Sequence, residues 1–321
     1  MRIAVTGSIA TDHLMTFPGK FAEQILADKL DRISLSFLVD GLEIRRGGVA
    51  ANIAFGLGCL GLSPMLVGTV GRDFGEYDAW LRQHGVDTSR VRESDIHQTA
   101  RFVCTTDADH SQIASFYPGA MGEAADLDIS GLAGEAGLVL IGAGNPAAML
   151  SLTSQCRALS LPFAADTSQQ LATLDGEQIR QLVGGAAYLF SNEYEASLTE
   201  HKTGWSATEV IAEVGVRITT LGSEGARVDR AGEPPVLVGP VKDVSPLEPT
   251  GSGDAFRAGF LAAVAWGLSF ERAAQLGNLV AVHALEVAGP QEYDLTRDTL
   301  AARCNVSYGQ TAADEIVAHL R

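Results

Sequence analysis

Residues 248–263 read Glu-Pro-Thr-Gly-Ser-Gly-Asp-Ala-Phe-Arg-Ala-Gly-Phe-Leu-Ala-Ala, which places a glycine-rich loop directly before a helix. The loop Gly251-Ser252-Gly253 can present backbone N–H groups at the positive end of the helix dipole, where they would stabilise a transferring phosphoryl group. Asp254 then lies in the first helical turn, where a carboxylate can accept the proton of an attacking hydroxyl. An ordinary helix start with a capping Asp is the alternative interpretation.

Outside this stretch, strand-like and helix-like segments alternate, which is typical of a parallel sheet with helices on both faces. The expected strands cover residues 2–7, 65–70, 137–141, 162–165, 187–190 and 217–221, followed by a hairpin within 226–241. The expected helices cover residues 48–60, 76–84 and 146–159, and the chain after Ser252 is expected to be mostly helical. The sequence has no internal repeat, and 321 residues suffice for one large α/β domain. We therefore expect a single domain over residues 1–321.

Three segments break this rhythm by alternating polar and apolar residues. They lie within residues 32–46 (ISLSFLVDGLEI), 99–106 (TARFVCTT) and 111–117 (SQIASFY). Period-two alternation is typical of a sheet whose two faces meet different surroundings. We expect a small accessory sheet, built from about residues 13–46 and 98–118, that acts as a lid over a site.

The composition excludes several classes of partner. Lys and Arg number 23 and Asp and Glu number 39, so the net charge is −16. This balance argues against nucleic-acid and anionic-membrane partners, which need a basic face, but not against ATP, which backbone N–H groups and Mg²⁺ can hold. The longest apolar runs, such as 258–268, are too short or too interrupted by Gly to cross a bilayer, and MRIAVTGSIA at the N-terminus lacks a signal-peptide pattern. We expect a cytoplasmic protein whose four cysteines, without a CxxC pair, are reduced and bind no metal.

The loop and a second motif resemble a known family. EPTGSGDAFRAGF at 248–260 resembles the C-terminal signature of the PfkB (ribokinase-like) family of carbohydrate and nucleoside kinases, with Glu248 where the family usually has Asp. RGGVAAN at 46–52 resembles its N-terminal signature, and the resemblance covers essentially the whole chain in the family's order. It implies a ribokinase-like three-layer α/β/α sandwich with a small β-sheet lid. It also implies that Gly251, Ser252 and Gly253 form an anion hole beside the base, Asp254.

The same resemblance implies where ATP and Mg²⁺ bind. Asn192-Glu193-Tyr194-Glu195 matches a family motif, which implies that Asn192 lies near ATP and that Glu195 holds Mg²⁺ through water. A helix start capped by Asn192 is the simpler alternative. TTLGSEG at 219–225 resembles the family's ATP-binding turn and implies ATP contacts from Thr220, Gly222 and Gly225. For the adenine of ATP we look to residues 275–283, and to Asn278 within them.

The lid segments indicate which acceptor is phosphorylated. Residues 34–40, 100–107, 112–121 and 163–172 are similar to adenosine kinases of the actinobacterial type. This likeness implies that Phe102 and Phe116 stack on a purine, whereas without it both would be interpreted as lid-sheet core. The other implied acceptor contacts are Asp12 on two hydroxyls, Ser8, Ser36, Gly48 and Asn52 on the ribose side, and Gln169 and Gln170 on the adjoining wall. Thr173 stands where the likeness leads us to expect a basic residue.

The expected reaction is ATP-dependent phosphorylation of the 5′-hydroxyl of a purine nucleoside, adenosine to AMP in purine salvage, with Mg²⁺. Within the family, a kinase of ribose or of a fructose derivative is the alternative. The resemblance implies a homodimer formed through the lid, and exposed lid edges favour such pairing.

Two alternatives come from other classes. GAGNPA at 142–147 follows an expected strand and opens a helix, and Asp166 comes 24 residues after Gly142, a pattern compatible with a nucleotide-binding oxidoreductase. GLGCLG at 56–61 also fits GxGxxG, but it lies inside an expected helix. The second alternative is a non-catalytic binding protein on a kinase fold, which Asp254 and its glycine loop disfavour.

Overall fold

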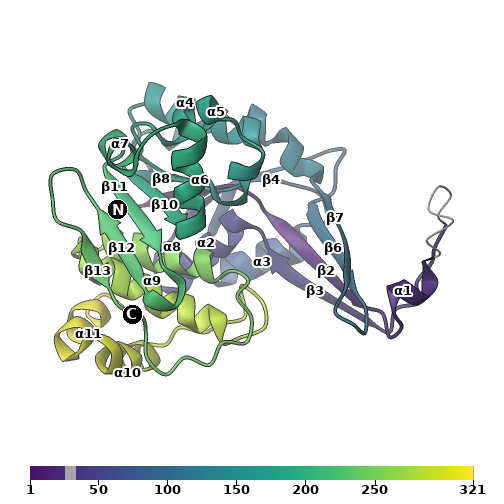
Figure 1. Ribbon diagram of the computed structural model, residues 1–321. Coiled ribbons are helices and arrows are strands. Elements are labelled where there is room, and N and C mark those ends of the chain that lie inside the picture. The colour runs from purple at the N-terminus through teal and green to yellow at the C-terminus, as the bar shows by residue number, and fades with distance from the viewer. Residues whose placement is uncertain (26–33, 321) are drawn as a thin grey trace.

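A nine-stranded sheet forms the centre of the protein in a computed structural model that describes residues 1–25 and 34–320 (Figure 1). Its strands run in the order β13-β12-β11-β10-β9-β8-β1-β4-β5, parallel from β11 to β5 and antiparallel in the hairpin of β12 and β13. The bounds are β1 Ile3–Thr6, β4 Met65–Val70, β5 Asp87–Glu93, β8 Leu138–Ile141, β9 Phe163–Asp166, β10 Tyr188–Asn192, β11 Val216–Thr220, β12 Ala226–Asp229 and β13 Val236–Val238. Strands β1, β4, β8 and β9 are buried along their whole length, as their near-continuous apolar sequences predict.

Helices cover both faces of this sheet. One face carries α2 Val49–Cys59, α3 Gly75–Gln83, α8 Ser252–Ala265, α9 Phe270–Leu285, α10 Arg297–Tyr308 and α11 Gln310–Val317, and the other carries α4 Pro146–Ala158, α5 Gly176–Val183, α6 Glu193–Thr203 and α7 Ala207–Glu213 (Figure 1). Neighbouring side chains of a strand point to opposite faces. Ile3 and Val5 of β1 therefore lie in the hydrophobic core beneath α2, α8 and α9, and Ala4 lies in the core beneath α4 and α5. Shorter helical turns are α1 Phe21–Gln24, η2 Gly119–Asp126, η3 Ser130–Leu132, η4 Ser168–Ala172 and η5 Gly222–Glu224. Among the described residues, no helix is long and apolar enough to cross a membrane.

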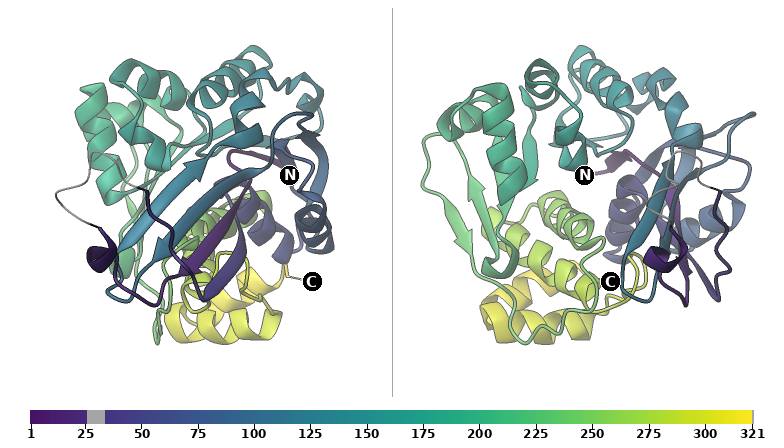
Figure 2. Two further views of the ribbon diagram at one scale, coloured as in Figure 1. Left: turned by 90° about the vertical axis from the view of Figure 1, so that its right-hand side faces the viewer. Right: turned by 45° about the vertical axis from the view of Figure 1, so that its right-hand side comes forward.

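A second, four-stranded sheet stands along one side of the large domain (Figure 2). Its order is β3-β2-β6-β7, with β2 Ala10–Thr16, β3 Gly41–Gly47, β6 Ala100–Thr106 and β7 Gln112–Tyr117. Asp12 lies opposite Arg45 on β3 and opposite Phe102 on β6, and Phe102 lies opposite Phe116 on β7. Residues directly opposite one another share a face of a sheet. The carboxylate and the two aromatic rings therefore lie on one face of the lid.

Most of the expected strands and helices are present, and the differences fall on the lid and the sheet edge. The strand expected over 32–46 was wrong for residues 34–40, which form no strand, while residues 32 and 33 lie outside the described part of the chain. In this segment Phe37 packs on Phe17 and Phe21, with ring centroids 5.1 and 4.9 Å apart, so the apolar alternation serves an aromatic cluster. Strands β2 and β5 were not predicted because their sequences, ATDHLMT and DTSRVRE, are rich in polar residues.

Candidate active site

Two cavities lie on either side of the turn that precedes α8. The first has a volume of about 420 Å³ and the second about 610 Å³, both within the usual range of small-molecule sites. Thr250, Gly251 and Asp254 line the first cavity. Pro249, Ser252 and Gly253 line the second. One turn of six residues is therefore a wall common to both cavities.

Gly251 determines the shape of this turn. It is the N-cap of α8 with φ of +79°, and a Cβ at this position would lie 2.4 Å from Cβ of Pro290. Only glycine fits such a backbone at such a distance. The N–H groups of Gly253 and Asp254 belong to the first helical turn, where no intrahelical acceptor exists, so they can bind an anion. The N–H of Ser252 differs from the expectation, since it donates to the carbonyl of Pro249 at 3.2 Å.

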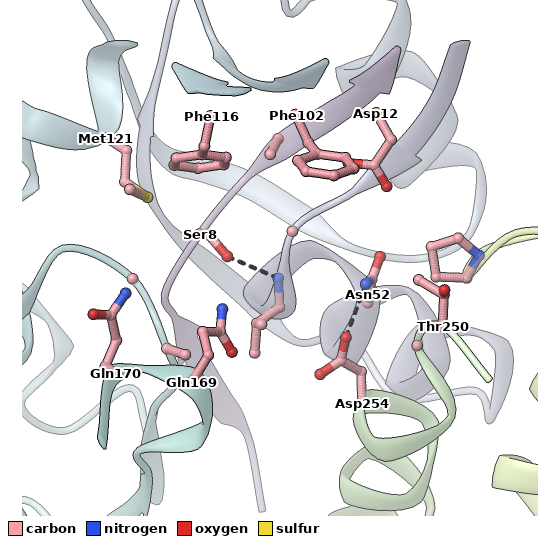
Figure 3. Close-up of a pocket in the computed structure, with 17 residues that line it drawn as sticks. Ser8, Asp12, Asn52, Phe102, Phe116, Met121, Gln169, Gln170, Thr250 and Asp254 are labelled. Atoms are coloured by element: carbon pink, nitrogen blue, oxygen red, sulfur yellow. Dashed lines mark hydrogen bonds between the residues drawn. The ribbon is translucent and has the colours of Figure 1, made fainter. Parts of the chain in front are cut away.

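Asp254 is held at the floor of the first cavity by a chain of hydrogen bonds (Figure 3). Asn52 of α2 donates from Nδ2 to Oδ2 of Asp254 at 2.8 Å. Gln291 donates from Nε2 to Oδ1 of Asn52 at 2.9 Å and to the hydroxyl of Tyr77, and Tyr77 donates to the carbonyl of Gly47 at 2.9 Å. Because Gln291 occupies the oxygen of the Asn52 amide, the amide nitrogen of Asn52 faces Asp254.

Burial raises the pKa of Asp254 to about 7. The positive charge of Arg257 and the hydrogen bond from Asn52 act in the opposite direction, while the negative charges of Asp166 and Glu195 add to the rise. A carboxyl with a pKa near neutrality is suited to accept and release a proton at physiological pH.

The first cavity is lined by residues from the lid and from the large domain. Phe102 and Phe116 lie side by side on its lid side, with Asp12 next to them (Figure 3). Burial raises the pKa of Asp12, the charge of Arg45 opposes this, and the charge of Glu248 adds to it. Arg45 is itself ion-paired to Glu248, with Nη1 and Oε2 2.6 Å apart, so the lid is tied to the segment before the catalytic turn.

Ser8 and Gly48, which were expected on the ribose side of an acceptor, form part of the wall of the first cavity. The hydroxyl of Ser8 accepts the N–H of Val49 at 2.9 Å, at the start of α2. Gly48 has φ of +95°, and a Cβ there would lie 2.6 Å from the carbonyl oxygen of Ser8, so the backbone approach excludes any larger residue. With Asn52, both residues line the cavity.

Gln169 and Gln170 line the opposite wall, on η4 (Figure 3). The hydroxyl of Thr173 donates to Oε1 of Gln170 at 3.0 Å. This contact occupies the amide oxygen and leaves the amide N–H groups of Gln170 to other acceptors. Thr173, which replaces the expected basic residue, therefore orients a wall residue without lining the cavity.

The second cavity is lined by both polar and apolar residues. Among them are four residues for which ATP contacts were expected, Thr220, Gly222, Gly225 and Asn278, and its apolar walls come from Val241, Val244, Phe256, Ala281, Val282 and Leu285. Asn278 donates from Nδ2 to the carbonyl of Gly239 and to the hydroxyl of Tyr308, each at 3.1 Å. Both amide hydrogens are thereby used, and Oδ1 of Asn278 remains to accept a hydrogen bond from a ligand. An apolar slot with a single acceptor suits a flat heterocycle that carries an amino group.

Comparison with known proteins identifies the family. Residues 12–297 match the pfkB family of carbohydrate kinases. The chain belongs to the PfkB family. Nucleoside kinases of Methanocaldococcus jannaschii and Methanothermobacter thermautotrophicus are 28% and 30% identical to it, over 94% and 82% of this chain and 96% and 86% of theirs. The enzyme is therefore a phosphotransferase that acts on a hydroxyl group, as expected.

Solved structures agree with this assignment. The structure of Burkholderia thailandensis nucleoside kinase in complex with inosine is 34% identical, with a TM-score of 0.82 over 96% of this chain and 98% of that one. The same protein in complex with ADP-inosine has a TM-score of 0.81 over 96% of each chain. The expected ribokinase-like fold is confirmed.

Membership of the PfkB family overturns the oxidoreductase alternative, and the structure explains the misleading motifs. Asp166 is fully buried in an ion pair with Arg257, so it is not placed to bind a ribose. Ala143 and Gly144 line the first cavity instead of cradling a dinucleotide. The glycine pattern at 56–61 serves helix packing, since a Cβ at Gly56 would lie 2.7 Å from Cβ of Ala258.

Three expected site residues of this PfkB protein lie outside both cavities. Asn192 and Glu195 form a capping box at the start of α6, in which Oδ1 of Asn192 accepts the N–H of Glu195 at 2.8 Å and Oε2 of Glu195 accepts the N–H of Asn192 at 2.9 Å. The simpler helix-start interpretation thus describes their contacts, although the charge of Glu195 still raises the pKa of Asp254. Ser36 is exposed on the segment before β3 and does not line the cavity.

Sequence reasoning missed the residues that orient the expected ones. Tyr77 and Gln291 contact the site through partners that are far away in the chain, as Gln291 and Asn52 are separated by 239 positions, and Arg257 is held by Asp166, 91 positions away. Neither Tyr77 nor Gln291 belongs to a short motif with a mechanism of its own. Arg257 lies inside the quoted stretch, where its charge in a run of Ala, Phe and Gly was the one available signal.

We expect Asp254→Asn to raise the melting temperature at pH 8 by a few degrees. The unfolded chain binds the Asp254 proton with a pKa of about 3.9, whereas the folded chain binds it with a pKa of about 7. Folding stability of the wild type therefore falls as the pH rises through this window and stays lowered above it. Calorimetry at pH 8, 6 and 5 should show that the difference in melting temperature between Asp254→Asn and the wild type becomes smaller as the pH falls. The control is Asp298→Asn, an exposed first-turn Asp of α10; an equal gain at every pH for Asp254→Asn would contradict the raised pKa.

Proposed function

We propose that this protein transfers the γ-phosphoryl group of ATP to the 5′-hydroxyl of a purine nucleoside, adenosine first among them. The observation that carries the proposal is the pair of cavities that meet at one turn. The first suits the acceptor and the second suits the donor. The turn between them supplies amide donors and a carboxylate, which are the parts that phosphoryl transfer needs.

The lining of the first cavity supports a nucleoside acceptor. Two aromatic rings on one face offer a flat surface to a purine, and a free sugar has no use for it. Asp12 can accept hydrogen bonds from two vicinal ribose hydroxyls, and Asn52 can reach the sugar from the floor. A purine that lies against the lid and a ribose held by Asp12 direct the 5′-hydroxyl toward Asp254. The inosine bound by the Burkholderia thailandensis relative favours the same substrate class.

The lining of the second cavity supports ATP as the donor. Its apolar walls would take the adenine, with the amino group near Oδ1 of Asn278, and the part at Thr220 and Gly222 would take the sugar and phosphates. From there the γ-phosphate reaches the N–H groups of Gly253 and Asp254. Mg²⁺ is commonly held by one or two carboxylates together with phosphate oxygens and water, and Glu195, whose charge acts on Asp254, would supply one such carboxylate. When bound, Mg²⁺ neutralises phosphate charge.

Asp254 would act as the general base. Its Oδ2 is engaged by Asn52, and its other oxygen points into the first cavity (Figure 3). Ionised Asp254 would accept the proton of the 5′-hydroxyl as the 5′-oxygen attacks the γ-phosphorus, while the bond from that phosphorus to the bridging oxygen breaks and ADP leaves. The first-turn amides of α8 stabilise the charge that spreads over the phosphoryl oxygens.

A panel of acceptors tests the proposal. Adenosine, inosine, guanosine, ribose, fructose 6-phosphate and fructose 1-phosphate are each incubated with MgATP, and ADP and the phosphorylated acceptor are quantified together. We expect the highest kcat/KM for a purine nucleoside, with the product phosphorylated at the 5′ position. A sugar or sugar phosphate that is preferred over every nucleoside would replace the nucleoside assignment with the sugar-kinase alternative.

Asp254→Asn should lower turnover about 10²–10⁴-fold, the usual size of a general-base effect. The neutral amide has nearly the same shape, so KM for both substrates should change little. Initial rates at saturating acceptor and MgATP measure the loss, and Asp298→Asn serves as the matched control. Turnover close to wild type in Asp254→Asn would remove this residue from the mechanism.

Phe102→Leu and Phe116→Leu should raise KM for the nucleoside, each about tenfold, because a stacked aromatic pair contributes roughly 0.5–1.5 kcal/mol beyond its buried area. KM for ATP should stay unchanged, since neither ring lines the second cavity. The matched control is Phe270→Leu, an aromatic residue that lines neither cavity and packs on Tyr188 and Phe260. Nucleoside KM values that do not respond to either lid substitution would argue for a site that does not recognise the base.

A further inference from the structure

A buried ion pair lies directly beneath the catalytic turn. Arg257 of α8 places Nη2 2.7 Å from Oδ1 of Asp166 and Nε 2.6 Å from Oδ2, so the guanidinium and the carboxylate meet side by side through two atoms each. Asp166 is completely buried, and Arg257 is 6% exposed. Neither residue lines either cavity. The pair is thus close to the site and out of reach of a substrate.

The remaining nitrogen of the guanidinium contacts the turn itself. Nη1 of Arg257 donates to the carbonyl oxygen of Gly253 at 2.9 Å. That carbonyl belongs to the peptide unit whose N–H is the N–H of Asp254. The peptide is planar and trans, so a carbonyl fixed toward Arg257 directs the Asp254 N–H the opposite way, toward the mouth of the anion-binding turn. Arg257 therefore adds a second hydrogen bond to a peptide that the helix backbone already orients, and so reinforces the position of one of the amide donors.

Asp166 connects this contact to the acceptor wall. It is the last residue of β9, and η4 begins two residues later at Ser168 and carries Gln169 and Gln170. Through Asp166 and Arg257, the segment that lines the base side of the first cavity is joined to the first turn of α8. The ion pair thereby fixes the position of this wall of the cavity relative to the first turn of α8.

The stability of the fold does not by itself explain a pair of this kind. Replacing a buried ion pair with apolar residues is often neutral or stabilising, because two charges lose their hydration when they are buried. What an apolar pair cannot supply is the second, side-chain donor to the Gly253 carbonyl, beside the N–H of the helix, and a positive charge behind Asp254. Both belong to the chemistry of the turn.

We propose that Arg257 is a positioning residue for the phosphoryl transfer, held by Asp166 so that its guanidinium reinforces the position of the Gly253–Asp254 peptide and its positive charge faces the catalytic carboxylate. This role rests on the proposed function of Asp254 as the base. It goes beyond that function, because it places a residue that contacts neither substrate among those that set the rate.

The charges around Asp254 give the expected sign. Of the groups that face it, Arg257 lowers its pKa, as does the hydrogen bond from Asn52 on α2, whereas Asp166 on β9 and Glu195 on α6 raise it less strongly. Two more titratable groups lie nearby, Tyr77 on α3 and Tyr293, and burial raises the pKa of both, so they are neutral in the working range. Loss of Arg257 should therefore make Asp254 harder to ionise.

Three variants test the proposal through the pH dependence of kcat/KM for the acceptor at saturating MgATP. The wild type should lose activity below a pH of about 7, as Asp254 becomes protonated. Arg257→Met should lower kcat about 10²-fold, the effect of a small misplacement. It should also move this acidic limb upward by about 1 pH unit, the smallest shift that a neighbouring charge usually produces. Arg257→Lys keeps the positive charge but loses the several N–H donors of the guanidinium. The acidic limb of its pH profile should therefore stay near the wild-type position, while kcat falls.

The double variant Asp166→Asn/Arg257→Met removes both charges together. It therefore leaves no buried charge without its partner, which could otherwise cause misfolding. Its limb should also move upward, by less than that of Arg257→Met, and thermal melting verifies that each variant is folded. A limb that stays in place in both Met variants would reduce Arg257 to a structural role, and so would a Lys variant whose limb moves as far as that of Arg257→Met. Any protonation of the substrate affects all variants equally, because every variant is assayed with the same acceptor, so it does not contribute to the differences between their pH profiles. That acceptor is the one that the wild type phosphorylates best, so an error in the proposed nucleoside would leave this test intact.

Discussion

The left-handed turn at Gly251 is the constraint on which the site depends. With φ of +79° and Pro290 in the space that a side chain would need, this residue reverses the chain so that α8 begins between the two cavities. The first amides of the helix and Asp254 then face a common point. A larger residue at this position would move the start of the helix, and with it the amide donors and the base together.

The desolvated carboxylate of Asp254 beside that turn lowers the folding stability of the protein. Water would solvate an exposed Asp254 and keep its pKa low, whereas burial brings its pKa to about 7. The surrounding structure limits this rise with one amide and one guanidinium, and it keeps the carboxylate in place through Asn52, Gln291 and Tyr77. This arrangement lowers folding stability, and in the proposed function it provides a base that works near neutral pH.

The sequence was informative where function depends on the local backbone and silent where it depends on distant partners. The glycine loop, the helix after it, and the strands of the large sheet other than β5 follow from short-range patterns, and Gly48 and Gly251 occupy positions that only glycine fits. Glu195 was placed by motif, and its contacts proved to be those of a helix cap. Gln291 contacts Asn52 across 239 positions and Arg257 contacts Asp166 across 91, and no local pattern encodes these two contacts, whereas the contact of Arg257 with Gly253 is local.

The two halves of the site differ in how far a substitution in one residue displaces the others. The turn, Asn52 and the ion pair beneath α8 contact one another through buried hydrogen bonds, so a change in one displaces the others. Phe102 and Phe116, by contrast, lie on lid strands that contact the large domain at one face, and Phe116 is half exposed. New side chains on those strands alter the cavity without moving the base. In the proposed function, acceptor choice would therefore reside in the lid and the transfer step in the large domain, a division that would let one fold serve both sugar and nucleoside kinases.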